Sequence, residues 1–305
     1  MMAPEVLKQR IAEGIMAFPA TPFEPDGSLD SSHLTSHVAF LAQYDPTALV
    51  AAGGAGEIFS LTLAEHEQVL RATMEGAGRV PVIGGAGYGT SMACAMARAV
   101  ERAGGDGVLL LPPYLIRCEQ EGLFRHVSAV CSAVSIAVIP YSRDNALIGP
   151  ETLLRLAERH PNLIALKDGT GDLASVRGLQ AQLGDRMTIL NGAPTAEIFA
   201  AQFQTIGINS YSSAVFTFLP LLARRFYAAL RAGDQPLVAE MLREFYSPLV
   251  ELRDRKLGYS VSIVKAGLRV AGMSAGPVRA PLVDLDAGEE AYLAELVEKC
   301  SSWNR

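Results

Sequence analysis

The stretch "IAVIPYSRDNALIGPETLLRLAERHPNLIALK", residues 136–167, contains a complete strand–loop–helix–strand unit. Its two ends, residues 136–141 and 163–167, are short continuous apolar runs, which are typical of strands buried on both faces of a parallel sheet. Between them, after a loop bearing Gly149 and Pro150, residues 150–160 have the pattern of a helix. The stretch therefore predicts two parallel strands joined by a helical crossover.

The same unit recurs along the chain. The candidate strands are residues 14–18, 48–53, 80–85, 107–111, 136–141, 163–167, 187–190 and 205–211. Candidate helices between them include residues 62–76, 91–104, 119–133, 150–160 and 194–203. Eight such units at spacings of about 20 to 35 residues predict an α/β protein with a closed (β/α)8 TIM barrel.

The strand pattern stops near residue 219, and residues 219–232, 234–252 and 258–272 look helical. We therefore expect a catalytic barrel over residues 1–218 and a helical C-terminal extension, residues 219–305, packed on it. A doubly wound open sheet is the competing fold. It would carry a dinucleotide fingerprint after its first strand, and "PATPFEPDG" (19–27) is not one.

The composition limits the partners that the protein can have. Of 305 residues, 50% are hydrophobic and 19% charged, and the net charge is −6, which argues against a nucleic-acid or membrane partner. Charges interrupt the apolar residues of the first 18 positions, so we expect no export signal. Four scattered cysteines without C-x-x-C spacing suit a reducing compartment, and we expect a cytoplasmic protein.

Two residues at neighbouring strand ends are candidates for chemistry. Lys167, one of only five lysines, ends the sixth strand, where partial burial would lower its pKa and favour a Schiff-base nucleophile. The alternative is a solvated lysine, or one paired with Asp168 or Asp172. Tyr141 ends the fifth strand, so its phenol could reach the amine and move protons, or it could be a rim residue only.

Other residues carry weaker signals. The loop "GGAGE" (53–57) could present bare N–H groups to a carboxylate, or could be a simple turn. His33 and His37 have the i,i+4 spacing of metal ligands but lack partners, so we expect a solvated helix face and no metal site. The remaining histidines are expected to be surface or capping residues. Lys256 and Lys265 are expected to be structural or interface residues, although Lys265 could lie near a neighbouring loop.

Several motifs together resemble the dihydrodipicolinate synthase / N-acetylneuraminate lyase superfamily of Schiff-base barrels. They are "PATPFEPDGSLD" (19–30), "GGAGE" (53–57), "PVIGGAG" (81–87), "LLLPPY" (109–114), "PYSR" (140–143), "NLIALKDGTGD" (162–172) and "NGAPTAE" (191–197). The resemblance covers nearly the whole chain. It implies that Lys167 forms the imine and that Tyr141 relays protons.

Departures from the superfamily pattern narrow the reaction. The synthases carry two threonines where this chain has Gly54 and Ala55, and a second tyrosine at Leu115, so the resemblance argues against synthase activity. Three C-terminal blocks, "YSSAVF" (211–216), "RDRKLGYSVSIVKAG" (253–267) and "GPVRAPL" (276–282), resemble the decarboxylating dehydratases of the superfamily. Relative to those, Ala55 and Ser142 replace threonine and asparagine.

This resemblance implies a six-carbon 2-keto-3-deoxy sugar diacid as substrate and 2,5-dioxopentanoate, CO2 and water as products. The carboxylate beside the ketone would rest on Gly54 and Ala55. Candidates for the distal hydroxyls and carboxylate, or else simple turn and strand-end residues, are Gly192, Asn209, Ser212 and Ser213. The imine itself can serve as the electron sink, so no metal or organic cofactor is expected.

Two other functions stay open. An aldolase acting on a 2-keto-3-deoxy sugar acid would share the imine but release or add pyruvate. A non-catalytic sugar-acid-binding barrel would keep the scaffold alone. Relatives in the superfamily are commonly tetramers built from dimers, so the resemblance also implies a homo-oligomer, a tetramer or a dimer.

Overall fold

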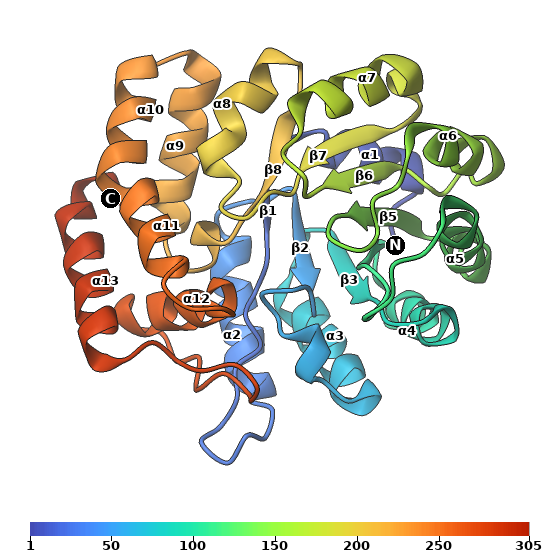
Figure 1. Ribbon diagram of the computed structural model, residues 1–305. Coiled ribbons are helices and arrows are strands. Elements are labelled where there is room, and N and C mark those ends of the chain that lie inside the picture. The colour runs from blue at the N-terminus through green and yellow to red at the C-terminus, as the bar shows by residue number, and fades with distance from the viewer. Residues whose placement is uncertain (305) are drawn as a thin grey trace.

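Parallel strands form a closed barrel in the computed structural model, which describes residues 1–304 (Figure 1). Each strand pairs with the next one in the chain, and the last returns to the first. The strands are β1 (Glu13–Ala17), β2 (Ala48–Ala51), β3 (Val82–Ala86), β4 (Gly107–Leu110), β5 (Ala137–Ser142), β6 (Ala165–Asp168), β7 (Thr188–Asn191) and β8 (Asn209–Ser213). The predicted (β/α)8 barrel is confirmed within these residues; Arg305, the last residue of the predicted extension, lies outside them.

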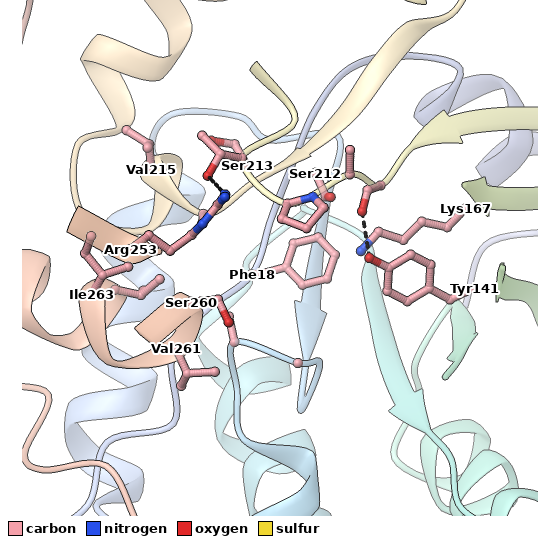
Figure 2. Close-up of a pocket in the computed structure, with 18 of the residues that line it drawn as sticks. Phe18, Tyr141, Lys167, Ser212, Ser213, Val215, Arg253, Ser260, Val261 and Ile263 are labelled. Atoms are coloured by element: carbon pink, nitrogen blue, oxygen red, sulfur yellow. Dashed lines mark hydrogen bonds between the residues drawn. The ribbon is translucent and has the colours of Figure 1, made fainter. Parts of the chain in front are cut away.

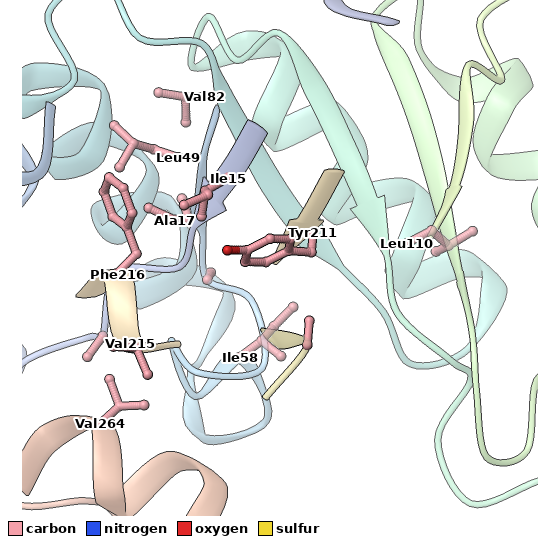
Figure 3. Packing of buried hydrophobic residues seen from close by; sticks show 14 of the residues in the cluster. Ile15, Ala17, Leu49, Ile58, Val82, Leu110, Tyr211, Val215, Phe216 and Val264 are labelled. Carbon is pink, nitrogen blue, oxygen red and sulfur yellow. The ribbon is translucent and has the colours of Figure 1, made fainter. Parts of the chain in front are cut away.

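Helices surround the barrel and bury its outer face. They are α2 (Ser31–Ala42), α3 (Leu63–Gly76), α4 (Thr90–Arg102), α5 (Gln120–Ala133), α6 (Pro150–Arg159), α7 (Leu173–Leu183) and α8 (Glu197–Thr205). Outward side chains of neighbouring strands, such as Leu49 and Val82, join the helices in one hydrophobic cluster (Figure 3). A shorter helix, α1 (Pro4–Ile11), adds Leu7 and Ile11 to a second cluster inside the barrel.

The strand register sets Tyr141 and Lys167 side by side. Ala137, Ile139 and Tyr141, alternate residues of β5, belong to the interior cluster, as does Ala165 of β6. Because successive side chains of a strand point to opposite faces, Lys167 also points inward, two residues after Ala165. The register pairs Tyr141 with Lys167 at the C-terminal ends of the two strands, as predicted.

The C-terminal region is helical and packs against one side of the barrel, next to α2 and α8 (Figure 1). Its helices are α9 (Pro220–Ala232), α10 (Gln235–Met241), α11 (Ser247–Arg253), α12 (Tyr259–Val270) and α13 (Ala287–Lys299). The predicted single helix over 234–252 contains a π-helical turn, η4 (Leu242–Tyr246), between α10 and α11. Short 3₁₀ turns complete the chain: η1 (Ile58–Ser60), η2 (Gly184–Arg186), η3 (Val215–Thr217) and η5 (Ser301–Trp303).

The last strand begins later than the sequence predicts. Helix α8 continues to Thr205, and a turn at Gly207, whose φ is +83°, precedes β8. Residues 205–208 are therefore helix end and turn, although their apolar character resembles a strand. As a consequence Asn209 is the first residue of β8 and not a strand-end residue, which corrects its predicted place at the mouth of the barrel.

Most histidines also differ from their predicted surroundings. His33 is exposed, but His37, His66, His126 and His160 are buried. In His37 and His66, Nε2 lies 2.8 Å from a backbone carbonyl oxygen, and burial lowers the pKa of both imidazoles, which favours the neutral form. A neutral imidazole can be buried without a charged partner when a backbone group hydrogen-bonds it. His37 and His66 are therefore packing residues of their helices. Among residues 1–304, no three His, Cys, Asp or Glu side chains gather as metal ligands.

Among residues 1–304, no helix is both long enough and apolar enough to span a membrane.

Candidate active site

A cavity of about 270 Å³ opens at the C-terminal ends of the strands (Figure 2). Barrel enzymes place their chemistry at this end, because the loops that follow the strands converge there. The cavity is lined by seven of the eight predicted site residues, namely Gly54, Ala55, Tyr141, Lys167, Gly192, Ser212 and Ser213. The eighth, Asn209, does not line it, because it lies at the opposite end of β8, where its carbonyl accepts a hydrogen bond from Tyr227 Oη at 2.9 Å.

Lys167 is a buried amine in the wall of this cavity. Its side chain is 5% exposed, and its Nζ lies 3.9 Å from the ring centroid of Tyr141 and 4.6 Å from that of Phe18. Burial, helped by the nearby charge of Arg143, lowers the pKa of the Lys167 amine to about 7. A substantial fraction of the amine is therefore unprotonated at neutral pH, which a nucleophilic amine requires.

The carboxylates that could have paired with Lys167 are used elsewhere. Asp168 accepts hydrogen bonds from Thr170 Oγ1 at 2.8 Å and from the N–H of Gly171 at 3.1 Å. Asp172 caps the first turn of α7. Within residues 1–304 Lys167 forms no ion pair, so its ammonium form lacks the stabilisation that a neighbouring carboxylate would supply.

The Tyr141 phenol has one acceptor and one cationic donor. Its Oη donates to the carbonyl of Gly192 at 2.6 Å and accepts from Arg143 Nη1 at 3.0 Å. Burial raises the pKa of the phenol, and the Arg143 guanidinium opposes this effect by favouring the phenolate. The phenol is thus held beside the amine with a fixed orientation, in a setting suited to taking up and returning a proton.

Gly192 contributes through its backbone and through its lack of a side chain. A Cβ at this position would lie 2.5 Å from Cγ and 2.7 Å from Cε of Lys167, so only glycine leaves room for the lysine. Its carbonyl is occupied by Tyr141, and its N–H donates to the Asp168 carbonyl at 2.6 Å. These contacts assign it to positioning the two central side chains.

The loop 53–57 presents backbone N–H groups at the cavity wall. Gly54 and Ala55 line the cavity, and within residues 1–304 neither of their N–H groups donates a hydrogen bond to the protein. Such bare donors suit an anion. Two contacts anchor the loop. Thr21 Oγ1 donates to the Gly56 carbonyl at 2.6 Å, and the side chain of Glu57, the last residue of the loop, accepts a hydrogen bond from the N–H of Arg279.

A fully buried ion pair connects this loop to the C-terminal region. Glu57 Oε1 lies 2.7 Å from Lys265 Nζ, and both side chains are 0% exposed. The lysine also donates to the Pro277 carbonyl at 2.7 Å, and the N–H of Arg279 donates to Glu57 Oε2 at 3.1 Å. Lys265 therefore lies against a neighbouring loop, in agreement with one of its two predicted placements.

The two serines of β8 are placed differently. Ser212 lines the cavity from the interior face of the barrel and is half-buried. Ser213 is fully buried, and its hydroxyl donates to Glu197 and accepts from the N–H of Phe216 at 3.0 Å. Burial raises the pKa of Glu197 to about 7. Only Ser212 keeps a hydroxyl free for a ligand, because Ser213 is engaged in this internal network.

Two arginines in the cavity wall were not identified from the sequence. Arg143 stands two residues after Tyr141, and Arg253 is the last residue of α11. Together with Lys167 they are the charged residues that line the cavity, and within residues 1–304 no Asp or Glu lines it. The position of Arg143 just after a strand end was an available signal. Arg253 comes from a helix outside the barrel pattern, so no strand-end rule could have indicated it.

The profile of the Dihydrodipicolinate synthetase family matches residues 11–300, and the chain belongs to this family. The crystal structure of dihydrodipicolinate synthase from Bacillus clausii superposes with a TM-score of 0.87 at 27% identity, covering 98% of this chain and 100% of that one.

Curated relatives are more similar in sequence. A protein of Rhizobium rhizogenes named probable 5-dehydro-4-deoxyglucarate dehydratase is 50% identical over 97% of this chain and 98% of its own length. A protein of Bradyrhizobium diazoefficiens with the same name is 50% identical over 98% of this chain and 95% of its own.

Proposed function

We propose that this chain is a decarboxylating dehydratase that converts 5-dehydro-4-deoxyglucarate into 2,5-dioxopentanoate, CO2 and water through an imine on Lys167. The observation that carries the proposal is a buried amine with a pKa of about 7, set in a cavity whose charged lining residues are cations. A dianionic keto acid complements this charge better than a sugar acid with a neutral tail. The names of the curated relatives support the same reaction.

The first half of the mechanism forms the imine. The unprotonated Lys167 amine attacks the ketone carbon, and the carboxylate next to the ketone binds the free N–H groups of Gly54 and Ala55. Tyr141 protonates the carbinolamine oxygen, which leaves as water. Arg143 stabilises the phenolate that remains, because its Nη1 lies 3.0 Å from Oη.

The second half uses the imine as an electron sink. Loss of a proton from the methylene next to the imine carbon gives an enamine, which expels the β-hydroxyl as water. The conjugated iminium formed in this way accepts the electron pair of the bond to the distal carboxylate, which leaves as CO2. Protonation and hydrolysis then release 2,5-dioxopentanoate and restore the amine. The imine nitrogen takes up the electron pairs released by deprotonation and by decarboxylation, and the pair of the broken C–O bond leaves with the β-hydroxyl, so the steps need only Lys167 and groups that move protons.

The departures at the cavity wall fit this reaction. Ala55 offers only its N–H to a carboxylate, and Leu115, which stands where the synthases carry a second tyrosine, is 81% exposed. In place of hydroxyl partners, the Tyr141 phenol has the Arg143 guanidinium and the Gly192 carbonyl. The proton relay of the synthases is therefore replaced by a phenol that is paired with a cation.

Product analysis tests the proposed function. The purified protein is incubated with 5-dehydro-4-deoxyglucarate, and CO2, 2,5-dioxopentanoate and pyruvate are measured, with Lys167→Met as the matched control. We expect the wild type to release CO2 and 2,5-dioxopentanoate, and the Lys167→Met variant to release neither. Release of pyruvate would replace this function by an aldolase, and absence of turnover together with measurable binding would replace it by a sugar-acid-binding barrel.

We further propose that the protein is a cytoplasmic homo-oligomer, a dimer or a tetramer. Tyr114, Leu115 and Ile116 form an apolar segment beside the site and are 71, 81 and 65% exposed, which favours burial against a second copy. The four cysteines are free, which suits a reducing compartment. Light scattering of the purified protein tests the assembly, and a monomer would contradict it.

We also propose that residues 219–305 are an extension of the barrel and not a separate folding unit. One hydrophobic cluster contains side chains of the barrel strands together with Phe226 of α9, Leu252 of α11 and Val264 of α12. A single cooperative unfolding transition is therefore expected in calorimetry, and two independent transitions would contradict this division.

A further inference from the structure

Arg253 is the cation that the catalytic steps leave without a role. It ends α11, lines the same cavity as Lys167, and its side chain is 15% exposed. Figure 2 shows Arg253 entering from the helical region on the left and Lys167 from the barrel on the right, with Ser212 and Phe18 between them in the view. The cavity is therefore bounded by a cation from the extension as well as by the amine.

The guanidinium is oriented by the protein and keeps donors available. Its Nη1 donates to Thr195 Oγ1 at 2.6 Å, and Thr195 lies in the loop between β7 and α8 with a φ of +49°. Nε and Nη2 donate to Asp254 at 2.7 and 3.0 Å. A guanidinium has five N–H groups, so these three bonds leave two. The Asp254 side chain is 60% exposed, so solvent screens the charge of this carboxylate.

The other charged groups of the cavity are already assigned to the reacting end. Arg143 donates to the Tyr141 phenol, and its charge acts on Lys167. The loop N–H groups take the carboxylate beside the ketone. A dianionic substrate carries a second carboxylate at the far end of its six-carbon chain, and Arg253 is the remaining cation in the wall.

We propose that Arg253, oriented by Thr195, binds the distal carboxylate of the substrate and makes the site selective for keto diacids over keto acids with uncharged tails. This inference rests on the proposed function, because it assumes that the ketone is held at Lys167. The contact is strongest before the reaction, since the carboxylate loses its charge when it leaves as CO2. An interaction weaker in the transition state than in the bound substrate acts mainly on KM, and only slightly on kcat.

Two probes of equal length separate this role from a structural one. They are 2-oxohexanedioate and 2-oxohexanoate, which share the ketone and its carboxylate but differ in the far carboxylate. Each is incubated with the protein, the imine on Lys167 is trapped with borohydride, and the half-saturating concentration is read by mass spectrometry. The variant is Arg253→Met, and Arg255→Met, a neighbouring arginine that does not line the cavity, is the matched control.

The wild type is expected to prefer the diacid. In Arg253→Met the half-saturating concentration of 2-oxohexanedioate should rise by about 10- to 100-fold, as for the loss of a hydrogen-bonded charge, while that of 2-oxohexanoate stays within about two-fold. Arg255→Met should behave as the wild type. With 5-dehydro-4-deoxyglucarate, Arg253→Met should raise KM and leave kcat unchanged or slightly higher, because the lost contact is weaker in the transition state than in the bound substrate.

The failures of the two proposals can be told apart. If neither probe is trapped on Lys167 of the wild type, the proposed function fails. If both are trapped and Arg253→Met leaves the preference for the diacid unchanged, the Schiff-base site stands and the role of Arg253 is overturned. If Arg253→Met traps neither probe, the test uses Arg253→Gln, which keeps a hydrogen-bond donor for Thr195. The ratio of the half-saturating concentrations of the two probes is then measured in this variant. A retained preference for the diacid overturns the role of Arg253, and a lost preference supports it.

Discussion

Replacing Lys167 by methionine should stabilise the protein while it abolishes imine formation. Burial, together with the charge of Arg143, lowers the pKa of the Lys167 amine from its ordinary 10.5 to about 7. The unfolded chain restores the ordinary value, so between pH 7 and 10.5 it binds a proton that the folded protein does not bind. The free energy of unfolding of the wild type therefore rises with pH through this window and includes the full penalty of a buried charge below pH 7.

The magnitude follows from the distance between the two pKa values. They differ by about 3.5 pH units, and each pH unit corresponds to about 1.4 kcal/mol, so charged Lys167 lowers the free energy of unfolding by about 5 kcal/mol at pH 6. At pH 9 the folded amine is neutral and the penalty has fallen to about 2 kcal/mol. The stability advantage of Lys167→Met should thus shrink by about 3 kcal/mol between these two pH values.

The assay is urea unfolding of both proteins at pH 6, 7, 8 and 9, with the free energy of unfolding extrapolated to water. Subtracting the wild-type value from that of the variant cancels the titration of groups that both proteins share. Differences in packing between methionine and a neutral lysine do not depend on pH, so only the slope of the difference reports the amine. A difference that stays constant from pH 6 to pH 9 would refute the buried, low-pKa lysine.

Three further substitutions test the parts that surround the amine. Arg143→Met removes a nearby cation, so the pKa of Lys167 should rise and the midpoint of the pH profile of borohydride trapping should move to higher pH. In the same variant kcat should fall by at least about 10-fold, because the phenolate of Tyr141 loses its cationic partner. An unchanged trapping profile would contradict the effect of the Arg143 charge on Lys167. Gly192→Ala places a methyl group 2.5 Å from Cγ of Lys167. Borohydride trapping on Lys167 should therefore be lost, and urea unfolding should show a destabilisation of about 1–3 kcal/mol. Normal trapping in this variant would contradict the predicted crowding. Lys265→Met leaves Glu57 buried without its partner and should lower the free energy of unfolding by about 3–5 kcal/mol in urea. Adding Glu57→Gln to the same chain should restore part of this loss. Wild-type stability of the single variant would show that the ion pair is dispensable.

The barrel and its central pair could be predicted because both depend on local rules. Strands buried on both faces appear as apolar runs, and their alternation with helical patterns leaves few topologies. Tyr141 and Lys167 end consecutive strands, and consecutive strands of a (β/α)8 barrel are neighbours. Their proximity therefore needed no knowledge of distant contacts.

The predictions that were wrong depended on where an element begins or which face it buries. Asn209 was placed at the wrong end of β8, because the apolar residues before it form a helix end and a turn, which periodicity does not distinguish from a strand. His37 was expected on a solvated helix face and His66 as a surface or capping residue, but both are buried and each lies within hydrogen-bond distance of a backbone carbonyl. A polar side chain in a helix is buried when its partner comes from another element, and that partner is not visible in the local pattern.

The sequence by itself determined the order of the strands and the pairing of Tyr141 with Lys167. The tertiary structure alone decided that Lys265 holds the loop at Glu57 and that Arg253 reaches the cavity. Both residues come from helices outside the repeating unit, and the placement of those helices follows from the packing of apolar faces far apart in the chain. The low pKa of Lys167 also belongs to the tertiary structure, because only burial by the whole barrel removes water from its amine.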